Sequence, residues 1–146
     1  MKGLVAAGLA LTASAAAAAP IEYLPAPAVQ GHSAPFSSAV RAGDILYLSG
    51  QIGIGPDGKL PAGLEAQTHQ AMNNIGTVLK RAGLGWGDVV HCTAMLSDMS
   101  NWPAFNKVYV SYFPAGRLPA RSAIGANGLA LGALLEVECQ AYTGKP

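Results

Sequence analysis

The sequence predicts a single α+β domain, with a mixed, mainly antiparallel sheet covered on one face by two helices. Two segments repeat apolar residues every three or four positions, as one-sided helices do, and five short runs resemble strands. Their order is strand, strand, helix, strand, helix, strand, strand, an arrangement typical of a two-layer α+β fold. The length of 146 residues fits one domain.

The first two strands are expected over residues 36–42 and 45–48, because Gly43 and Asp44 form a turn signal between them. A third strand is expected over residues 89–96. The last two, over residues 121–126 and 134–142, flank a loop that contains Asn127 and Gly128.

The longer helix is expected over residues 64–82, with Lys80 and Arg81 in its last turn and Gly83 as its end. The second begins near Asn101, with Pro103 in the first turn, where a missing N–H is tolerated. Both helices would cover the same face of the sheet. No further element remains for the opposite face, so we expect self-association, and the pattern does not choose between a dimer and a trimer.

The N-terminus is typical of an exported protein. Residues 1–19 combine Lys2, a short apolar run and an alanine block, which indicates a signal peptide, and the alternative is an uncleaved N-terminal anchor. Residues 20–34 are expected to form an extended N-terminal arm, and residues 35–146 the domain. The sequence therefore predicts a secreted or periplasmic protein that is not held at a membrane after cleavage.

Charge and cysteine content exclude several functions. Loss of Lys2 leaves eight basic and eight acidic residues, so no basic surface is predicted and nucleic acid is not an expected partner. The spacing of Cys92 and Cys139 and the scattered histidines do not suggest a metal site. Export permits a disulfide between the two cysteines, but the pattern favours two buried thiols.

Charged residues inside apolar strands mark a candidate site. Arg121 opens the fourth predicted strand, and Glu136 and Glu138 share one face of the fifth. An arginine fork binds a carboxylate bidentately, and a nearby glutamate can hold a water or pass a proton. Residue types alone favour the alternative, a structural salt bridge between Arg121 and one of the glutamates.

Six segments of the chain form a recognisable series: Pro35-Phe36-Ser37, residues 43–51, Ala82-Gly83, residues 105–109, residues 119–122 and residues 135–141. Taken together, they resemble the RidA/YjgF family of reactive-intermediate deaminases. The resemblance spans residues 33–143, and its most specific parts are Ser49-Gly50-Gln51 and Pro119-Ala120-Arg121-Ser122. It implies a chorismate-mutase-like fold, in agreement with the predicted strand order, and a homotrimer with a small-molecule site in each cleft between subunits.

The resemblance also implies an activity. Members that retain the arginine hydrolyse 2-imino or 2-enamino acids to 2-keto acids and ammonia, without a metal or an organic cofactor. Arg121 matches that arginine, which favours binding of a small 2-imino or 2-keto acid over a salt bridge. Glu136 is expected to position the attacking water, and Gly50 and Asn106 match residues that line the family's cleft.

Two departures from the family pattern affect the expected site. Phe36 stands where many active members have tyrosine, and Ala123 where many have cysteine. Both positions are expected to line the substrate site. The lost hydroxyl favours an alternative function, a non-catalytic small-carboxylate-binding or chaperone-like protein of the same fold. Ribonuclease activity has also been attached to the family, but neutral charge and export argue against it here.

Overall fold

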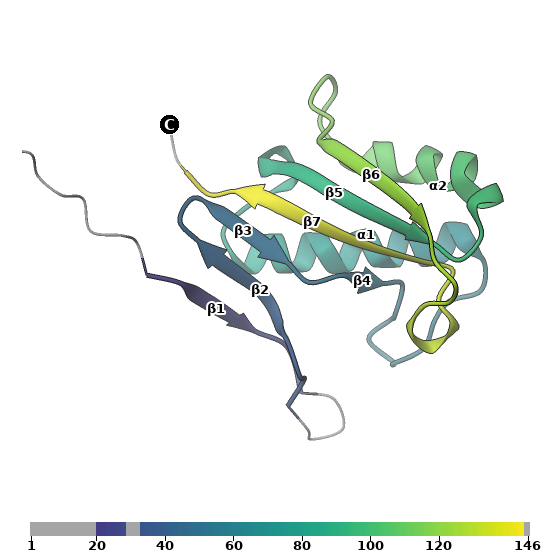
Figure 1. Ribbon diagram of the computed structural model, residues 1–146, viewed down its shortest axis with the longest axis horizontal. Helices are drawn as coiled ribbons and strands as arrows, with labels where there is room; N and C mark the ends of the chain where they lie inside the picture. Colours follow the sequence, from purple (N-terminus) through teal and green to yellow (C-terminus); the bar gives the residue numbers. More distant parts are fainter. Residues whose placement is uncertain (1–19, 29–32, 145–146) are drawn as a thin grey trace, which may run out of the picture.

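The computed structural model describes residues 20–28 and 33–144, which form one sheet and two α-helices (Figure 1). The strand order is β1-β2-β3-β7-β5-β6, and β4 pairs with β7. All pairs are antiparallel except β5 with β6, which confirms the predicted mixed, mainly antiparallel sheet. The elements are β1 (Glu22–Pro25), β2 (Ser37–Ala42), β3 (Ile45–Leu48), β4 (Gln51–Ile52), α1 (Leu64–Arg81), β5 (Val89–Leu96), α2 (Trp102–Tyr109), β6 (Ala120–Gly125) and β7 (Leu135–Tyr142).

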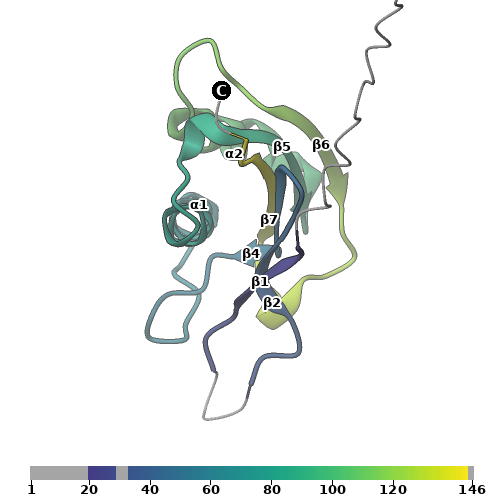
Figure 2. The same cartoon turned by 90° about the vertical axis from the view of Figure 1, so that its left-hand side faces the viewer.

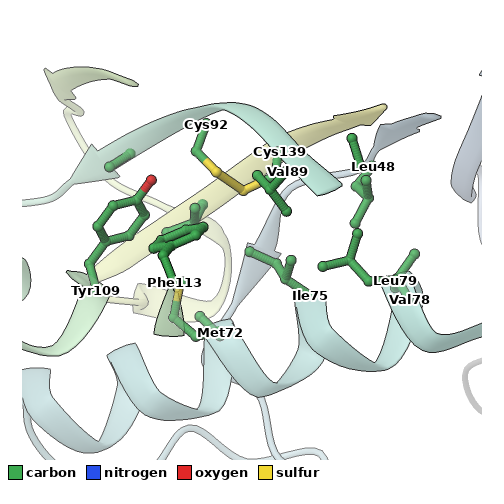
Figure 3. Packing of buried hydrophobic residues seen from close by; sticks show 14 of the residues in the cluster. Leu48, Met72, Ile75, Val78, Leu79, Val89, Cys92, Tyr109, Phe113 and Cys139 are labelled. Atoms are coloured by element: carbon green, nitrogen blue, oxygen red, sulfur yellow. A yellow bond between two sulfur atoms is a disulfide. The ribbon is translucent and has the colours of Figure 1, made fainter. Parts of the chain in front are cut away.

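Both helices cover the same face of the sheet, as the sequence predicts (Figure 2). The core fills the space between them and the sheet, where Met72, Ile75 and Leu79 of α1 are almost completely buried (Figure 3). No helix of the described residues covers the other face. That face carries exposed tyrosines, including Tyr47 and Tyr142.

The helix boundaries follow from local sequence. Glu65 lies in the first turn of α1 and two basic residues lie in its last turn, so both ends complement the helix dipole. Gly83 follows with φ of 74°, a conformation that favours glycine, and ends the helix. Pro103 occupies the first turn of α2.

No helix of the described residues has both the length and the apolar character needed to cross a bilayer.

Two short strands were not predicted. The arm expected over residues 20–34 contains β1, which pairs antiparallel with β2 and places Tyr23 opposite Val40. Four residues at a sheet edge, ending in proline, give no readable alternation. The two-residue β4, which pairs Gln51 with Val137, is too short for any periodic signal. The predicted signal peptide, residues 1–19, lies outside the described residues.

The preference for two free thiols was wrong. Cys92 of β5 and Cys139 of β7 are paired positions of the antiparallel ladder, with their Cα atoms 4.1 Å apart, and they form a disulfide (Figure 3). Both cysteines are buried on the face that the helices cover. A sequence separation of 47 residues conceals this pairing, because the register between β5 and β7 cannot be read from either strand alone.

The disulfide yields a first prediction. Neither Cys92 nor Cys139 should react with a maleimide in denaturant until a reductant is added. The Cys92→Ala/Cys139→Ala protein should unfold with a free energy about 2–4 kcal/mol below that of the wild type, since the cross-link restricts the unfolded chain. Denaturant titration of the oxidised wild type and of the variant measures this difference. Labelling of two thiols without reductant would contradict the assignment.

Candidate functional site

Arg121 lies against the aromatic side chains of α2. In the parallel pair of β5 and β6 it is the partner of Cys92, so its side chain leaves the sheet on the helix-covered face. The guanidinium carbon is 4.4 Å from the ring centroid of Trp102 and 4.5 Å from that of Tyr109. Residues seven apart on a helix face the same way, so both rings reach the same cation.

Arg121 forms no ion pair with either glutamate. Within the described part of the chain the one salt bridge joins Arg41 to Glu22, at 3.5 Å. The Nη1 atom of Arg121 is buried and lacks a hydrogen-bond partner. The structural salt bridge considered from the sequence is therefore absent, and the guanidinium is held by ring faces that use none of its N–H donors.

Two further polar atoms of α2 are buried without a partner, the Tyr109 hydroxyl and the Asn106 side-chain oxygen. Burial raises the pKa of Tyr109 to about 12, against the opposing effect of the Arg121 charge, so the hydroxyl stays protonated and can donate at neutral pH. In Figure 3 this hydroxyl points away from α1. Unpaired buried polar groups are rare in folded proteins. Their presence around Arg121 marks a candidate binding site.

Glu136 lies on the other face of the sheet, close to Gly50. It is the partner of Ile52 in β4 and of Met95 in β5, three positions from Cys139, so its side chain points away from the helices. A Cβ atom at residue 50 would collide with the Glu136 carboxylate, so any larger residue there would displace this carboxylate from its position. Partial burial raises the pKa of Glu136, and the charge of Glu138 adds to the effect.

A groove of about 720 Å³ adjoins Glu136, and we call it the α1 groove. Phe36, Gly50 and Glu136 belong to its lining, and α1 forms one wall with Asn74 and Thr77 among others. The remaining lining residues are Ala26, Pro27, Ala34, Ser38, Gln51, Ile52, Ile54, Gly55, Pro56, Gln70, Val78, Arg81 and Ala130.

The predicted site residues form two groups. Phe36, Gly50 and Glu136 share the α1 groove. Ala123 lies on β6 two residues after Arg121, on the same face, and Asn106 lies on α2. Within one chain Arg121 and Glu136 leave the sheet on opposite faces, so the structure does not bring these two residues together.

Sequence reasoning missed two features, the aromatic support of Arg121 and the α1 groove. The spacing of Trp102 and Tyr109 was visible, but it also fits an ordinary core-facing stripe. The groove depends on tertiary placement of β4 and has no sequence signal.

Among the described residues, no group of three or more histidine, cysteine or acidic side chains is arranged to hold a metal ion.

Comparison with known proteins gives consistent results. Residues 27–143 match the family model described as Endoribonuclease L-PSP. The chain is 40% identical over 121 residues to a mouse protein named 2-iminobutanoate/2-iminopropanoate deaminase, covering 82% of this chain and 87% of the mouse protein. It is 37% identical over 135 residues to the Arabidopsis thaliana Reactive Intermediate Deaminase A, covering 91% of this chain and 70% of that protein.

Solved structures agree with the sequence matches. The crystal structure of the YjgF gene product from E. coli superimposes with a TM-score of 0.72 at 31% identity, covering 82% of this chain and 94% of that chain. The family model, which matches residues 27–143, includes both groups of candidate site residues.

The unpaired state of Arg121 yields a prediction about stability. Arg121→Met should change the free energy of unfolding by no more than about 1 kcal/mol, because loss of the cation–π contact is offset by removal of an unsatisfied buried N–H. The matched control is Arg81→Met, which breaks hydrogen bonds to Ser38 and the Pro25 carbonyl and should cost about 1 kcal/mol or more. Denaturant unfolding measures both. A loss of 3–5 kcal/mol for Arg121→Met would indicate a buried ion pair instead.

The raised pKa of Glu136 yields a prediction about titration. Removing the neighbouring negative charge in Glu138→Gln makes the ionised form of Glu136 less unfavourable, so its pKa should fall towards the ordinary value. Carbon-detected NMR of the Glu136 carboxyl over a pH series measures the midpoint. It should remain somewhat raised, since burial is the larger cause. An unchanged or higher midpoint in the variant would show that Glu138 has no such effect.

Proposed function

The chain belongs to the RidA/YjgF family, whose model is described as Endoribonuclease L-PSP, and on this premise we propose that it is an enamine/imine deaminase. It would hydrolyse small 2-imino acids to 2-keto acids and ammonia. The observation that carries the proposal is the state of Arg121, a cation supported by two aromatic rings and paired with no carboxylate of the described chain. A substrate carboxylate is the missing partner.

The complete site would be assembled from two copies of the chain. Arg121 and Glu136 point to opposite faces of one sheet, so a single chain cannot direct both at one small substrate. Arg121 of one subunit would lie next to Phe36, Gly50 and Glu136 of the neighbouring subunit. The uncovered sheet face, with its exposed tyrosines, supports such an assembly, and the family resemblance favours a homotrimer.

The chemistry needs little from the protein, because an imine carbon is already electrophilic. Arg121 would donate two hydrogen bonds to the carboxylate and fix the position of the imine carbon. Glu136 would accept a proton as a water oxygen adds to that carbon. Addition to the protonated imine gives a carbinolamine, and Glu136 would then return its proton to the nitrogen. The carbon–nitrogen bond breaks as the hydroxyl group releases its proton to solvent and becomes the keto oxygen. One water and one protonated imino acid thus give one keto acid, one ammonia and one proton. The raised pKa of Glu136 suits both steps.

Phe36 and Ala123 remove a hydroxyl and a thiol from this site, and they leave Arg121 and Glu136 as its main reactive groups. The alternative function, a non-catalytic protein that binds small carboxylates, would need Arg121 but not Glu136. The two functions therefore differ in their dependence on Glu136.

We also propose that the protein is exported, as the sequence of residues 1–19 indicates. The disulfide between Cys92 and Cys139 supports this, because such bonds persist mainly in oxidising compartments. Free thiols in protein recovered from its source cells, detected by the labelling described above, would count against export.

The activity prediction concerns Arg121 and Glu136. The purified protein should release keto acid from a 2-imino acid generated in situ by an amino-acid oxidase. Arg121→Ala should lower kcat/KM by about 100-fold or more, since both binding and orientation are lost. The matched control, Arg117→Ala, removes an arginine that donates a hydrogen bond to the Gly87 carbonyl and belongs to neither group of candidate site residues, so this variant should remain active.

A mixed assembly tests whether two subunits share the site. Arg121→Ala and Glu136→Gln proteins, each inactive alone, should regain part of the activity when unfolded and refolded together, because some sites then combine an intact arginine with an intact glutamate. Activity of Arg121→Ala equal to the wild type would contradict the mechanism. Ligand binding that requires Arg121, without turnover of any imine, would establish the non-catalytic alternative.

A further inference from the structure

The α1 groove is much larger than a three- or four-carbon imino acid requires. Its volume of about 720 Å³ lies within the range of pockets that enclose drug-sized ligands, ~300–1,000 Å³. It is continuous with the proposed reaction site, since Glu136 and Gly50 belong to its lining. A substrate held at these two residues therefore has room beside it for a sizeable side chain.

Two sets of side-chain hydrogen bonds, made by Asn74 and by Arg81, hold the walls of the α1 groove in place, and we call them the two tethers. The Asn74 side chain donates to the carbonyls of Ile52 and Ile54, at 3.1 and 3.0 Å, and fixes the segment around β4 against α1. Arg81 donates to the Ser38 hydroxyl and to the Pro25 carbonyl, at 3.2 and 2.9 Å, and fixes the β1–β2 pair. The space between the two tethers is thus a pre-formed feature of the monomer.

The lining is mainly apolar. Ile52, Ile54 and Val78 line the groove, and Asn74 and Arg81 already use donors in the tethers. Phe36, a residue that is 58% exposed, adds an aromatic ring to the lining. With phenylalanine in place of tyrosine, no hydroxyl at this position has to find a partner when an apolar group covers it.

We propose that the α1 groove binds the substrate side chain, and that the protein prefers 2-imino acids with large apolar side chains, branched aliphatic or aromatic, over those with a methyl or ethyl group. This inference rests on the proposed deaminase function and adds the substrate class. Burial of extra methylene groups in the groove supplies the preference, at roughly 10-fold or more in kcat/KM for each group that is well enclosed.

The experiment compares imino acids generated in situ from leucine, phenylalanine and alanine. The wild type should hydrolyse the leucine-derived imine with a kcat/KM at least about 10-fold above that for the alanine-derived imine. Thr77→Trp, which narrows the groove from α1, should abolish most of this advantage and affect the alanine-derived imine much less. The matched control is Lys80→Trp, which adds the same ring to α1 outside the groove and should preserve the preference.

The outcomes separate the two proposals. Equal rates for the imines, or a preference for the alanine-derived one, would overturn the groove inference and leave the deaminase function intact. Hydrolysis of none of the imines would overturn the deaminase function. Calorimetry with the product keto acids then tests side-chain binding in the α1 groove independently of turnover. 4-Methyl-2-oxopentanoate should bind more tightly than pyruvate to the wild type, and this difference should be absent in Thr77→Trp. Equal binding of the two keto acids to the wild type would overturn the groove inference.

Discussion

The contact of the Arg121 guanidinium with the rings of Trp102 and Tyr109 is the interaction on which the functional account depends. Ring faces orient a cation without using its hydrogen-bond donors, whereas a carboxylate would use them. The rings therefore hold the guanidinium in place and leave its hydrogen-bond donors available, as the proposed binding of a substrate carboxylate requires. The unpaired atoms of Arg121 and Tyr109 are the cost of this arrangement in the isolated chain.

The sheet separates the two groups of candidate site residues. Arg121 lies on its helix-covered face and Glu136 on its open face, so under the proposed function each chain would contribute one half to each of two different sites. Assembly would cover the open face of the sheet and would also bring the two halves of each proposed active site together. The Cys92–Cys139 disulfide joins β5 to β7 directly beside the position of Arg121, and so fixes the register on which both halves depend.

The sequence predicts the features that depend on local pattern. Both helices and the five longer strands lie within a residue or two of their expected positions, because α1 and β7 carry strong periodicity. It fails where the deciding contact is distant. The disulfide depends on the register of two strands whose cysteines are 47 residues apart in the sequence. The edge strand β1 is stabilised by pairing with β2 and by a hydrogen bond from Arg81. The α1 groove depends on Asn74, which holds the chain near β4 against α1. Arg121 and Glu136 were identifiable as rare charges in apolar strands, but their opposite faces became visible only in the paired sheet.

A crystal structure of the assembled protein with a bound 2-keto acid tests the central claim most directly. The account predicts that the ligand carboxylate accepts hydrogen bonds from Arg121 of one subunit while the rest of the ligand lies beside Glu136 of another. Arg121 should keep its place over the rings of Trp102 and Tyr109. A ligand bound far from Arg121, or an Arg121 that pairs with a glutamate across the subunit interface and leaves no space for a ligand, would contradict the account.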